Sequence, residues 1–289
     1  MTTAMPRLRF APSPNGRLHL GHAYSVLFTE RAAASLGGGI TLRIEDIDPI
    51  RSRPEFEAAI IEDLTWLGVR WQEPVLCQSS RMEAYAEAAH LLRARDLLYP
   101  CFCSRREVAA RAQTADPDGA PLYTGACRNL SRDEVHTRIG RDEAVQWRLH
   151  MDRAFSEVGL IDITEAPADD RNALWSDAAQ RTANPAVWGD AVIIRKDTPT
   201  SYHLSVVVDD AWQGITHVTR GMDLFAATDL HVLLQRLLNL PTPVYCHHRL
   251  LRDGAGEKLA KSRGSQSLAD LRAAGWSAEH VRSRLGFAQ

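Results

Sequence analysis

Short apolar runs and amphipathic segments alternate along the first hundred residues, and this order limits the fold more than any other feature of the sequence. Residues 8–11 and 40–44 have the length and mainly apolar character of short strands, and residues 22–36 carry apolar side chains at helical spacing. Ser52-Arg53-Pro54-Glu55 and Ser80-Arg81-Met82-Glu83 have the pattern of capping boxes and predict two further helices, which end near residues 67 and 95. Strands and helices in this order predict an α/β fold, with a parallel sheet and helices on both of its faces.

The alternation stops at Pro100. Residues 101–190 look irregular, with a cysteine cluster and one predicted strand at 145–149. Strand patterns return at residues 191–195, 205–208 and 217–219, followed by a predicted helix at 228–238 and a strand at 244–246. We therefore expect two halves of one sheet domain at residues 1–98 and 191–248, an irregular insertion at 99–190, and a loop with a short helical tail at 249–289.

The composition is that of an ordinary globular protein, since 45% of the 289 residues are hydrophobic and 24% are charged. This excludes disorder and coiled coils, and the apolar runs are too short to span a bilayer, so no membrane contact is expected. Five cysteines do not suggest a disulfide framework, and the start of the chain shows no signal peptide, so we expect a cytoplasmic protein. The net charge of −2 predicts that any contact with nucleic acid is local. No segment looks like an association helix, and a monomer is expected.

The first candidate site lies where the first predicted strand ends in a Pro/Gly-rich loop and a helix begins with His19-Leu20-Gly21-His22. Free N–H groups and a partial positive charge at a helix N-terminus attract phosphate. Gly21 lets a base or ribose approach the backbone, and His19 and His22 can donate to phosphate oxygens or to a departing pyrophosphate. By itself, the pattern fits two surface histidines at a helix cap equally well.

A basic motif far along the chain favours the phosphate-binding interpretation over two surface histidines. Lys258-Leu259-Ala260-Lys261-Ser262 follows the Gly-rich residues 253–256, and two lysines three residues apart on a loop can close over a triphosphate. Together the two motifs resemble the HIGH and KMSKS signatures of class I aminoacyl-tRNA synthetases. The resemblance implies a ligase with a Rossmann-like catalytic domain and ATP bound with Mg²⁺. It also implies catalytic roles for His19, His22, Lys258 and Lys261, and ATP contacts for His19, Gly21, His22 and Lys261.

Three more segments resemble the glutamyl and glutaminyl branch of that family, namely residues 9–16 (RFAPSPNG), 42–48 (LRIEDID) and 220–224 (RGMDL). The likeness extends from residue 7 to about residue 262, and 27 residues follow Ser262, too few for the anticodon-binding domains of a complete glutamyl-tRNA synthetase. A catalytic core without an anticodon reader resembles the glutamyl-Q tRNA(Asp) synthetases. That resemblance implies activation of L-glutamate and its transfer to the queuosine base in the anticodon of tRNA(Asp).

The ammonium and the two carboxylates of glutamate need partners in a partly dry pocket. Glu45 directly follows a predicted strand, where ligands of open α/β sheets bind, and can accept the α-ammonium, although a surface salt bridge is its ordinary role. Arg9 and Arg220 can each bind a carboxylate bidentately, which favours glutamate over glutamine, and the sequence leaves open which arginine meets which carboxylate. The resemblance adds Tyr202 and the segment Arg9, Phe10, Ala11, Pro12 and Ser13 to the glutamate site.

The candidate metal ligands are Cys101, Cys103 and Cys127. Three thiolates leave a tetrahedral zinc ion one ligand short. The resemblance implies Tyr123 as the fourth ligand of one structural Zn²⁺, whereas the residues alone favour His136, because imidazole is the commoner zinc ligand. The other two cysteines stand alone in the sequence and are expected to be ordinary buried side chains.

Other functions fit the same residues. One is a compact glutamyl-tRNA synthetase that acts on the tRNA 3′ end, with its anticodon reader absent or on a separate chain. Another is a nucleotidyltransferase of the same fold that acts on a small acid, against which Glu45, Tyr202 and Arg220 argue. A catalytically inactive paralogue is disfavoured, because both histidines and both lysines of the signature motifs are present.

Overall fold

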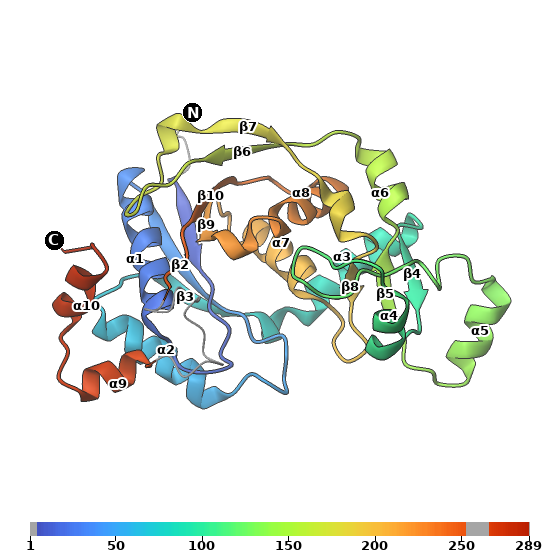
Figure 1. Cartoon of the computed structure of the whole chain (residues 1–289), viewed down its shortest axis with the longest axis horizontal. Helices are drawn as coiled ribbons and strands as arrows, with labels where there is room; N and C mark the ends of the chain where they lie inside the picture. Colours follow the sequence, from blue (N-terminus) through green and yellow to red (C-terminus); the bar gives the residue numbers. More distant parts are fainter. Residues whose placement is uncertain (1–4, 253–265, 289) are drawn as a thin grey trace.

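The computed structural model describes residues 5–252 and 266–288, as an α/β fold with three hydrogen-bonded sheets (Figure 1). Two of these sheets lie edge to edge and are called the larger sheet here, and the third is the smaller sheet. The strands are β1 (Arg7–Phe10), β2 (Gly39–Ile44), β3 (Gln72–Cys77), β4 (Leu98–Cys101), β5 (Gln146–Leu149), β6 (Asp162–Ala166), β7 (Ala179–Thr182), β8 (Val192–Ile194), β9 (His217–Gly221) and β10 (Val244–His248). The α-helices are α1 (Leu20–Ser35), α2 (Pro54–Trp66), α3 (Met82–Ala94), α4 (Arg105–Arg111), α5 (Arg132–Gly140), α6 (Met151–Val158), α7 (Tyr202–Trp212), α8 (Ala227–Leu237), α9 (Leu268–Ala273) and α10 (Ala278–Arg284). Across these described segments, no helix has the length and apolar character needed to cross a membrane.

The larger sheet is built from two groups of strands that meet between β1 and β9. Strands β1, β2 and β3 pair in parallel, as do β9, β10 and β6, and β7 closes the edge antiparallel to β6. At the junction, the Thr216 N–H donates to the Arg7 carbonyl over 2.9 Å. The strand order reverses at this point, and ligands of open parallel sheets bind at such a switch point, beyond the carboxyl ends of the strands.

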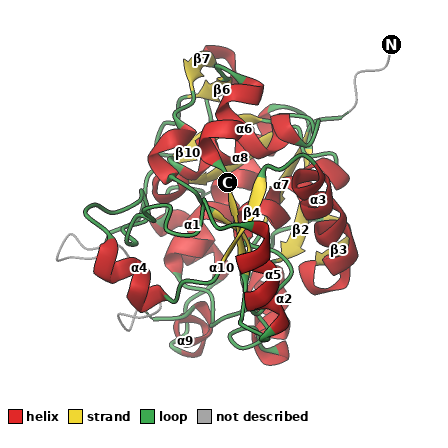
Figure 2. Cartoon of the chain, turned by 90° about the vertical axis from the view of Figure 1, so that its right-hand side faces the viewer, coloured by secondary structure: helices red, strands yellow, loops and turns green. Residues whose placement is uncertain are grey.

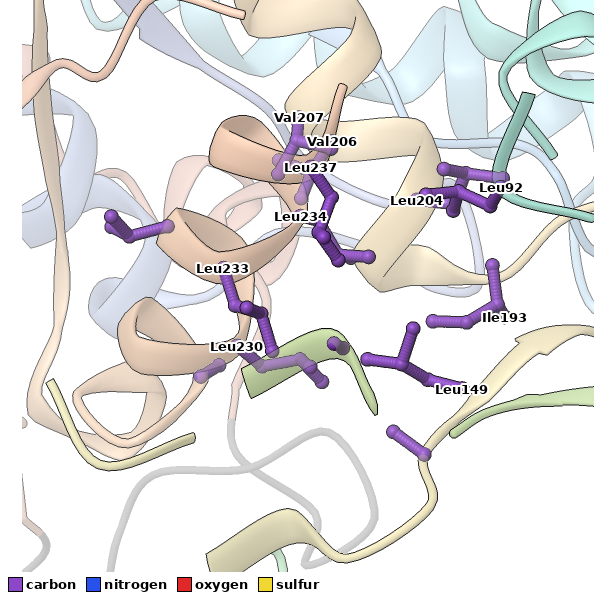
Figure 3. Close-up of a cluster of buried hydrophobic side chains, with 14 of the residues drawn as sticks. Leu92, Leu149, Ile193, Leu204, Val206, Val207, Leu230, Leu233, Leu234 and Leu237 are labelled. Atoms are coloured by element: carbon purple, nitrogen blue, oxygen red, sulfur yellow. The ribbon is translucent and has the colours of Figure 1, made fainter. Parts of the chain in front are cut away.

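Apolar side chains form cores on opposite faces of the larger sheet. Tyr245 and Cys246 are neighbours on β10, yet the first packs in the core that holds α7 and α8, and the second in the core that holds α1. Figure 3 shows the first core, where leucines of α8 meet side chains from α3, β5, β8 and α7. The predicted parallel sheet with helices on both faces is therefore confirmed.

The smaller sheet, β4-β5-β8, is antiparallel and lies at the end of the molecule that carries α4 and α5 (Figure 1). Figure 2 views the molecule from this end. Residues 99–190, expected as an irregular insertion, hold more regular structure than the sequence suggested. The sequence did not reveal these elements because they are only three to nine residues long and show little periodicity. The same range also contributes β6 and β7 to the larger sheet.

The strand predicted at residues 205–208 is wrong, because these residues lie inside α7. Ser205, Val206 and Val207 are all buried, and a short, fully buried apolar run has no period that separates a strand from a helix. Tertiary packing then outweighs the strand propensity of β-branched side chains.

The two capping boxes predicted at Ser52 and Ser80 are also wrong. Helix α2 has Arg53 as its N-cap, without a side-chain bond, since Pro54 occupies the first helical position. Ser80 lies in a 3-10 turn before α3, where its hydroxyl donates to the Cys77 carbonyl over 2.7 Å. Both serines lie one residue before the actual N-cap, so the pattern located the helices but not their caps.

The C-terminal helices return to the first half of the larger sheet, beside α1 and α2 (Figure 1). Arg282 on α10 donates to the Leu67 carbonyl over 2.9 Å and pairs with Glu30 on α1 at 3.0 Å. Ser267, which caps α9, forms an isolated antiparallel bridge with His19. The end of the chain therefore contacts the start of α1, where the first candidate motif lies.

Candidate active site

A cavity of about 1230 Å³ opens at the carboxyl ends of β1, β2, β3, β9 and β10. It is lined by every described residue that the sequence assigned to glutamate or ATP: Arg9, Phe10, Ala11, Pro12, Ser13, His19, Gly21, His22, Glu45, Tyr202 and Arg220. Lys258, Lys261 and Ser262 lie outside the described residues. The chain thus folds residues from position 9 to position 220 around one space at the switch point of the sheet.

Two buried arginines share one carboxylate, and one of the two, Arg9, lines the cavity. Asp210 on α7 accepts from Arg9 Nε over 3.1 Å and from Arg43 Nη2 over 2.8 Å. Arg43, which lies in β2, also donates to Gln213 Oε1 over 3.0 Å, and Arg9 donates to the Thr219 carbonyl over 3.3 Å. These contacts fix both guanidinium groups against α7 and β9.

Glu45 follows the last residue of β2, as the sequence predicted, and its side chain is 11% exposed. Its Oε1 lies 3.6 Å from Arg43 Nε, and its backbone N–H donates to the Pro12 carbonyl over 3.0 Å. Burial raises the pKa of Glu45 to about 7, although Arg43 and Arg9 oppose the shift. An ammonium group bound here would add a further positive charge beside the one from Arg43 and would favour the ionised carboxylate.

Asp209, the neighbour of Asp210 on α7, is fully buried, and its carboxylate faces α3. Gln78 Nε2, Arg81 Nε and the Tyr85 hydroxyl donate to it over 2.8, 2.6 and 2.6 Å. Each oxygen of the carboxylate is therefore satisfied by side chains of the η1–α3 segment (Gln78–Ala94), which ties α7 to α3. Gln78 also lines the cavity, so this bond links the cavity wall to the helix layer.

Arg220, at the end of β9, is held by neutral groups. Its Nε donates to His247 Nε2 over 3.3 Å, its Nη1 lies 3.0 Å from His231 Nδ1, and its Nη2 donates to the Thr228 hydroxyl. Tyr202 stands nearby with its ring centroid 5.4 Å from that of His231, and burial raises the pKa of its hydroxyl. The predicted substrate residues Tyr202 and Arg220 therefore reach the same cavity from α7 and β9.

The two histidines of the first motif cap α1. His19 is the N-cap, and its Nδ1 accepts from the Gly21 N–H over 3.0 Å, while His22 Nδ1 accepts from the His19 N–H over 3.1 Å. A neutral imidazole that accepts through Nδ1 carries its proton on Nε2. A Cβ on residue 21 would lie 2.8 Å from His19 Cε1, so this capping arrangement requires a glycine there.

The three predicted metal-ligating cysteines lie together, away from the cavity. The sulfur atoms of Cys101, Cys103 and Cys127 lie within 4.8 Å of one another, and the last two are 3.6 Å apart. Sulfurs of a tetrahedral zinc site lie about 3.8 Å apart, about 1.6 times the Zn–S distance of about 2.3 Å, so the separation of Cys103 and Cys127 fits zinc. The Tyr123 hydroxyl accepts from the Cys127 N–H over 2.7 Å, which places it beside the cluster, whereas His136 is exposed on α5 and is not part of it.

The profile of the catalytic domain of class I tRNA synthetases (E and Q) matches residues 6–286. A glutamyl-Q tRNA(Asp) synthetase from Rhodobacter capsulatus is 46% identical over 284 residues, which cover 96% of this chain and 99% of the relative. A glutamate–tRNA ligase from Aquifex aeolicus is 35% identical, over 94% of this chain and 55% of the relative.

The chain belongs to the class I tRNA synthetases for glutamate and glutamine.

A solved structure supports the same fold. The glutamate–tRNA synthetase from Elizabethkingia anophelis superposes with a TM-score of 0.72 and 27% identity, over 90% of this chain. This chain spans about half of that structure, 53% of its length. The expectation of a ligase of the class I synthetase type is confirmed, and enzymes of this class use ATP with Mg²⁺.

Sequence reasoning missed several residues of this class I synthetase site. They include the ion pair of Arg43 with Asp210. They also include His231 and His247, the two histidines that hold Arg220. A weak signal was present, since Arg43 interrupts an apolar strand and Asp210 follows an apolar run within α7. A charge in such a place needs a buried partner, but the sequence alone does not say which one.

Proposed function

We propose that this synthetase activates L-glutamate with ATP and transfers it to the queuosine base in the anticodon of tRNA(Asp). The observation that carries the proposal is the single cavity that gathers all the described glutamate and ATP residues. The acceptor is suggested by the relatives named glutamyl-Q tRNA(Asp) synthetase, one of which this chain matches over almost the whole length of both proteins.

In the first step, an oxygen of the glutamate α-carboxylate attacks the α-phosphorus of ATP, and glutamyl-adenylate and pyrophosphate form. Mg²⁺ accompanies the ATP and neutralises phosphate charge. In our proposal, Glu45 accepts the α-ammonium, Arg9 and Arg220 bind carboxylates, and Tyr202 completes the pocket. The segment Phe10–Ser13 forms its wall.

The phosphates belong, in this proposal, at the N-terminus of α1. The Nε2–H groups of His19 and His22 donate to phosphate oxygens, and Gly21 allows the nucleotide to approach the backbone. Lys258 and Lys261 would neutralise the departing pyrophosphate. The protein needs no covalent intermediate of its own, because positioning and charge stabilisation lower the barrier.

The cysteine cluster supports a structural role in the same proposal. Cys101, Cys103 and Cys127 would hold one Zn²⁺, and the Tyr123 oxygen is the fourth ligand that we propose. A bound zinc ion would fix the ends of the smaller sheet and the loop before α5. The region 99–190 is then a stable platform that approaches the acceptor nucleic acid.

The test is transfer of labelled glutamate, in the presence of ATP, to tRNA from cells that make queuosine and from cells that cannot. The 3′ end is then removed by nuclease trimming, because periodate would attack the queuosine diol as well as the terminal ribose. We expect label that requires queuosine and survives trimming. Label that ignores queuosine and is lost with the 3′ end would instead identify a compact glutamyl-tRNA synthetase.

A further inference from the structure

The hydrogen bonds around Arg220 define the protonation states of two buried histidines, His231 and His247. An arginine side chain can only donate, so each nitrogen that faces it must accept. Arg220 Nη1 lies 3.0 Å from His231 Nδ1, and His231 Nε2 lies 3.1 Å from His203 Nδ1. His231 therefore accepts through Nδ1 and donates through Nε2, which makes it a neutral imidazole. His203, which accepts that bond, is neutral as well, and burial together with Arg220 lowers its pKa to about 4.

The same reasoning applies to the other side of Arg220. Glu165 on β6 lies 2.6 Å from His247 Nδ1, and the His247 bond and the Arg181 ion pair lower the pKa of Glu165 despite its burial. An ionised carboxylate only accepts, so His247 donates through Nδ1. Its Nε2 then accepts from Arg220 Nε, over 3.3 Å. His247 is neutral, and burial, followed by the charge of Arg220, keeps its pKa below the usual value.

Arg220 differs in this respect from the other buried arginines of the cavity. Arg9 and Arg43 both contact Asp210, and Arg43 also faces Glu45. Among the described residues, no carboxylate lies within ion-pair distance of Arg220, and Glu165 reaches it only through His247. Two N–H groups of its guanidinium remain after the bonds to His247, His231 and Thr228. These two groups can bind a ligand carboxylate bidentately.

We propose that His231 and His247 are positioning residues that determine specificity for an amino acid with a side-chain carboxylate. As neutral acceptors they fix the direction of the Arg220 guanidinium without cancelling its charge. The uncancelled charge makes the pocket prefer glutamate to the isosteric glutamine, which offers an amide in place of the carboxylate. This inference rests on the proposed glutamate activation and adds how the site recognises its substrate.

A matched pair of variants isolates the charge from the shape. His231→Gln and His231→Glu place an oxygen acceptor of the same geometry near Arg220 Nη1, and only the second carries a negative charge. ATP–pyrophosphate exchange gives kcat/KM for glutamate and for glutamine. We expect His231→Glu to lower the glutamate-to-glutamine ratio by at least about tenfold, through a higher KM for glutamate, because it neutralises Arg220. His231→Gln should keep the ratio within about threefold of the wild type.

Either of two results would overturn the proposal: an unchanged ratio in His231→Glu, or an equal loss in both variants, which would indicate a purely structural role. Thr228→Asp and Thr228→Asn form a second pair, directed at Arg220 Nη2, in case His231→Glu does not fold. The expectation is the same for this pair, with the charged variant alone losing preference.

A spectroscopic measurement on the unmodified protein provides an independent test. With ¹⁵N-labelled histidine, we expect His231 as the neutral Nε2–H tautomer and His247 as the neutral Nδ1–H tautomer at pH 7. The signals are assigned by their loss in His231→Gln and His247→Gln. An imidazolium at either position would refute the proposal. If the wild type activated neither amino acid, the proposed function would fail instead, and the tautomers would then test only how the two histidines orient Arg220.

Discussion

Three buried arginines line or support the cavity, and each has a different electrostatic environment. The sequence pointed to Arg9 and Arg220 because a fork of N–H donors suits a carboxylate. It did not point to Arg43, whose partner Asp210 is 167 residues away along the chain. A sequence motif can indicate that an arginine binds a carboxylate ligand. It cannot indicate that Arg9 and Arg43 share the carboxylate of Asp210, because that contact depends on how β1, β2 and α7 pack.

Glu45 gives a prediction about pH. Burial raises its pKa to about 7, so its carboxylate forms mainly above that value. If it accepts the α-ammonium, the dissociation constant for glutamate should fall about tenfold between pH 6 and pH 8, as the ionised fraction rises. Calorimetric titration in buffers of different ionisation enthalpy would also detect the released proton. Glu45→Gln should bind weakly and show no such trend, and a wild-type constant that is flat with pH would refute the assignment.

The same shift has a consequence for stability, with a defined sign. The folded state keeps a proton on Glu45 up to about pH 7, whereas the unfolded chain releases it near the ordinary value of 4.5. The contribution of this group is therefore fully present below pH 4.5 and is lost as the pH rises to about 7. The free energy of unfolding of wild-type protein should fall over this window relative to that of Glu45→Gln.

Gly21 gives a second prediction at this scale. An alanine there would place Cβ 2.8 Å from His19 Cε1, so the imidazole must leave its capping position. We expect Gly21→Ala to lower the ATP–pyrophosphate exchange rate by about 10²-fold, as when one charge-stabilising donor is lost, and to cost about 1 kcal/mol as a lost N-cap. Gly140→Ala is the control, because its Cβ would meet nothing within 4 Å. Equal activity of the two variants would mean that His19 does not act from this position.

At the scale of elements, the sequence located most helices and strands of the larger sheet, but it failed where packing decides the conformation. The α7 segment Ser205–Val208 has strand propensity, yet helix is adopted because its valines are buried against α3 and α8. Strands β6 and β7 had no recognisable pattern, because they are only five and four residues long, and β7 is an edge strand of mostly exposed residues. Packing between segments that are distant in the sequence therefore determines the secondary structure of these residues, which the local pattern does not predict.

The cysteine cluster gives a prediction about an element, the smaller sheet. If Cys101, Cys103 and Cys127 hold zinc, purified protein should contain about one zinc ion per chain by plasma mass spectrometry. Cys103→Ser should lose most of it and unfold at a lower temperature, because metal binding contributes directly to folding. Cys77→Ser serves as the control, as Cys77 lies outside the cluster.

Two further variants identify the fourth ligand. Tyr123→Phe should weaken zinc retention, whereas His136→Ala should not, because His136 is exposed on α5 and lies outside the cluster. Zinc retained fully by Cys103→Ser, or lost on replacing His136, would contradict this account of the site.

At the scale of the whole molecule, the larger sheet separates the two main cores and also connects them. Successive residues of β10 enter different cores, as Tyr245 and Cys246 do, and on β6 Ile163 and Ala166 likewise point into different cores. The residues that bind substrate, in our proposal, come from both halves of this sheet. A cavity assembled in this way depends on the integrity of both cores, because residues of each core line it, Phe10 and Tyr24 from one and Ile47 from the other.

This arrangement predicts that loss of packing in either core unfolds the whole chain. Leu27 on α1 and Leu233 on α8 are buried in different cores, whereas Leu160 is 81% exposed. Leu27→Ala and Leu233→Ala should each lower the free energy of unfolding by about 2–5 kcal/mol, and Leu160→Ala by less than about 0.5 kcal/mol. In urea, circular dichroism and tryptophan fluorescence should report one coincident transition for all three variants, since the strands of one sheet serve both cores. Transitions that separate in only one of the core variants would show that the two faces unfold independently and that the shared sheet does not couple them.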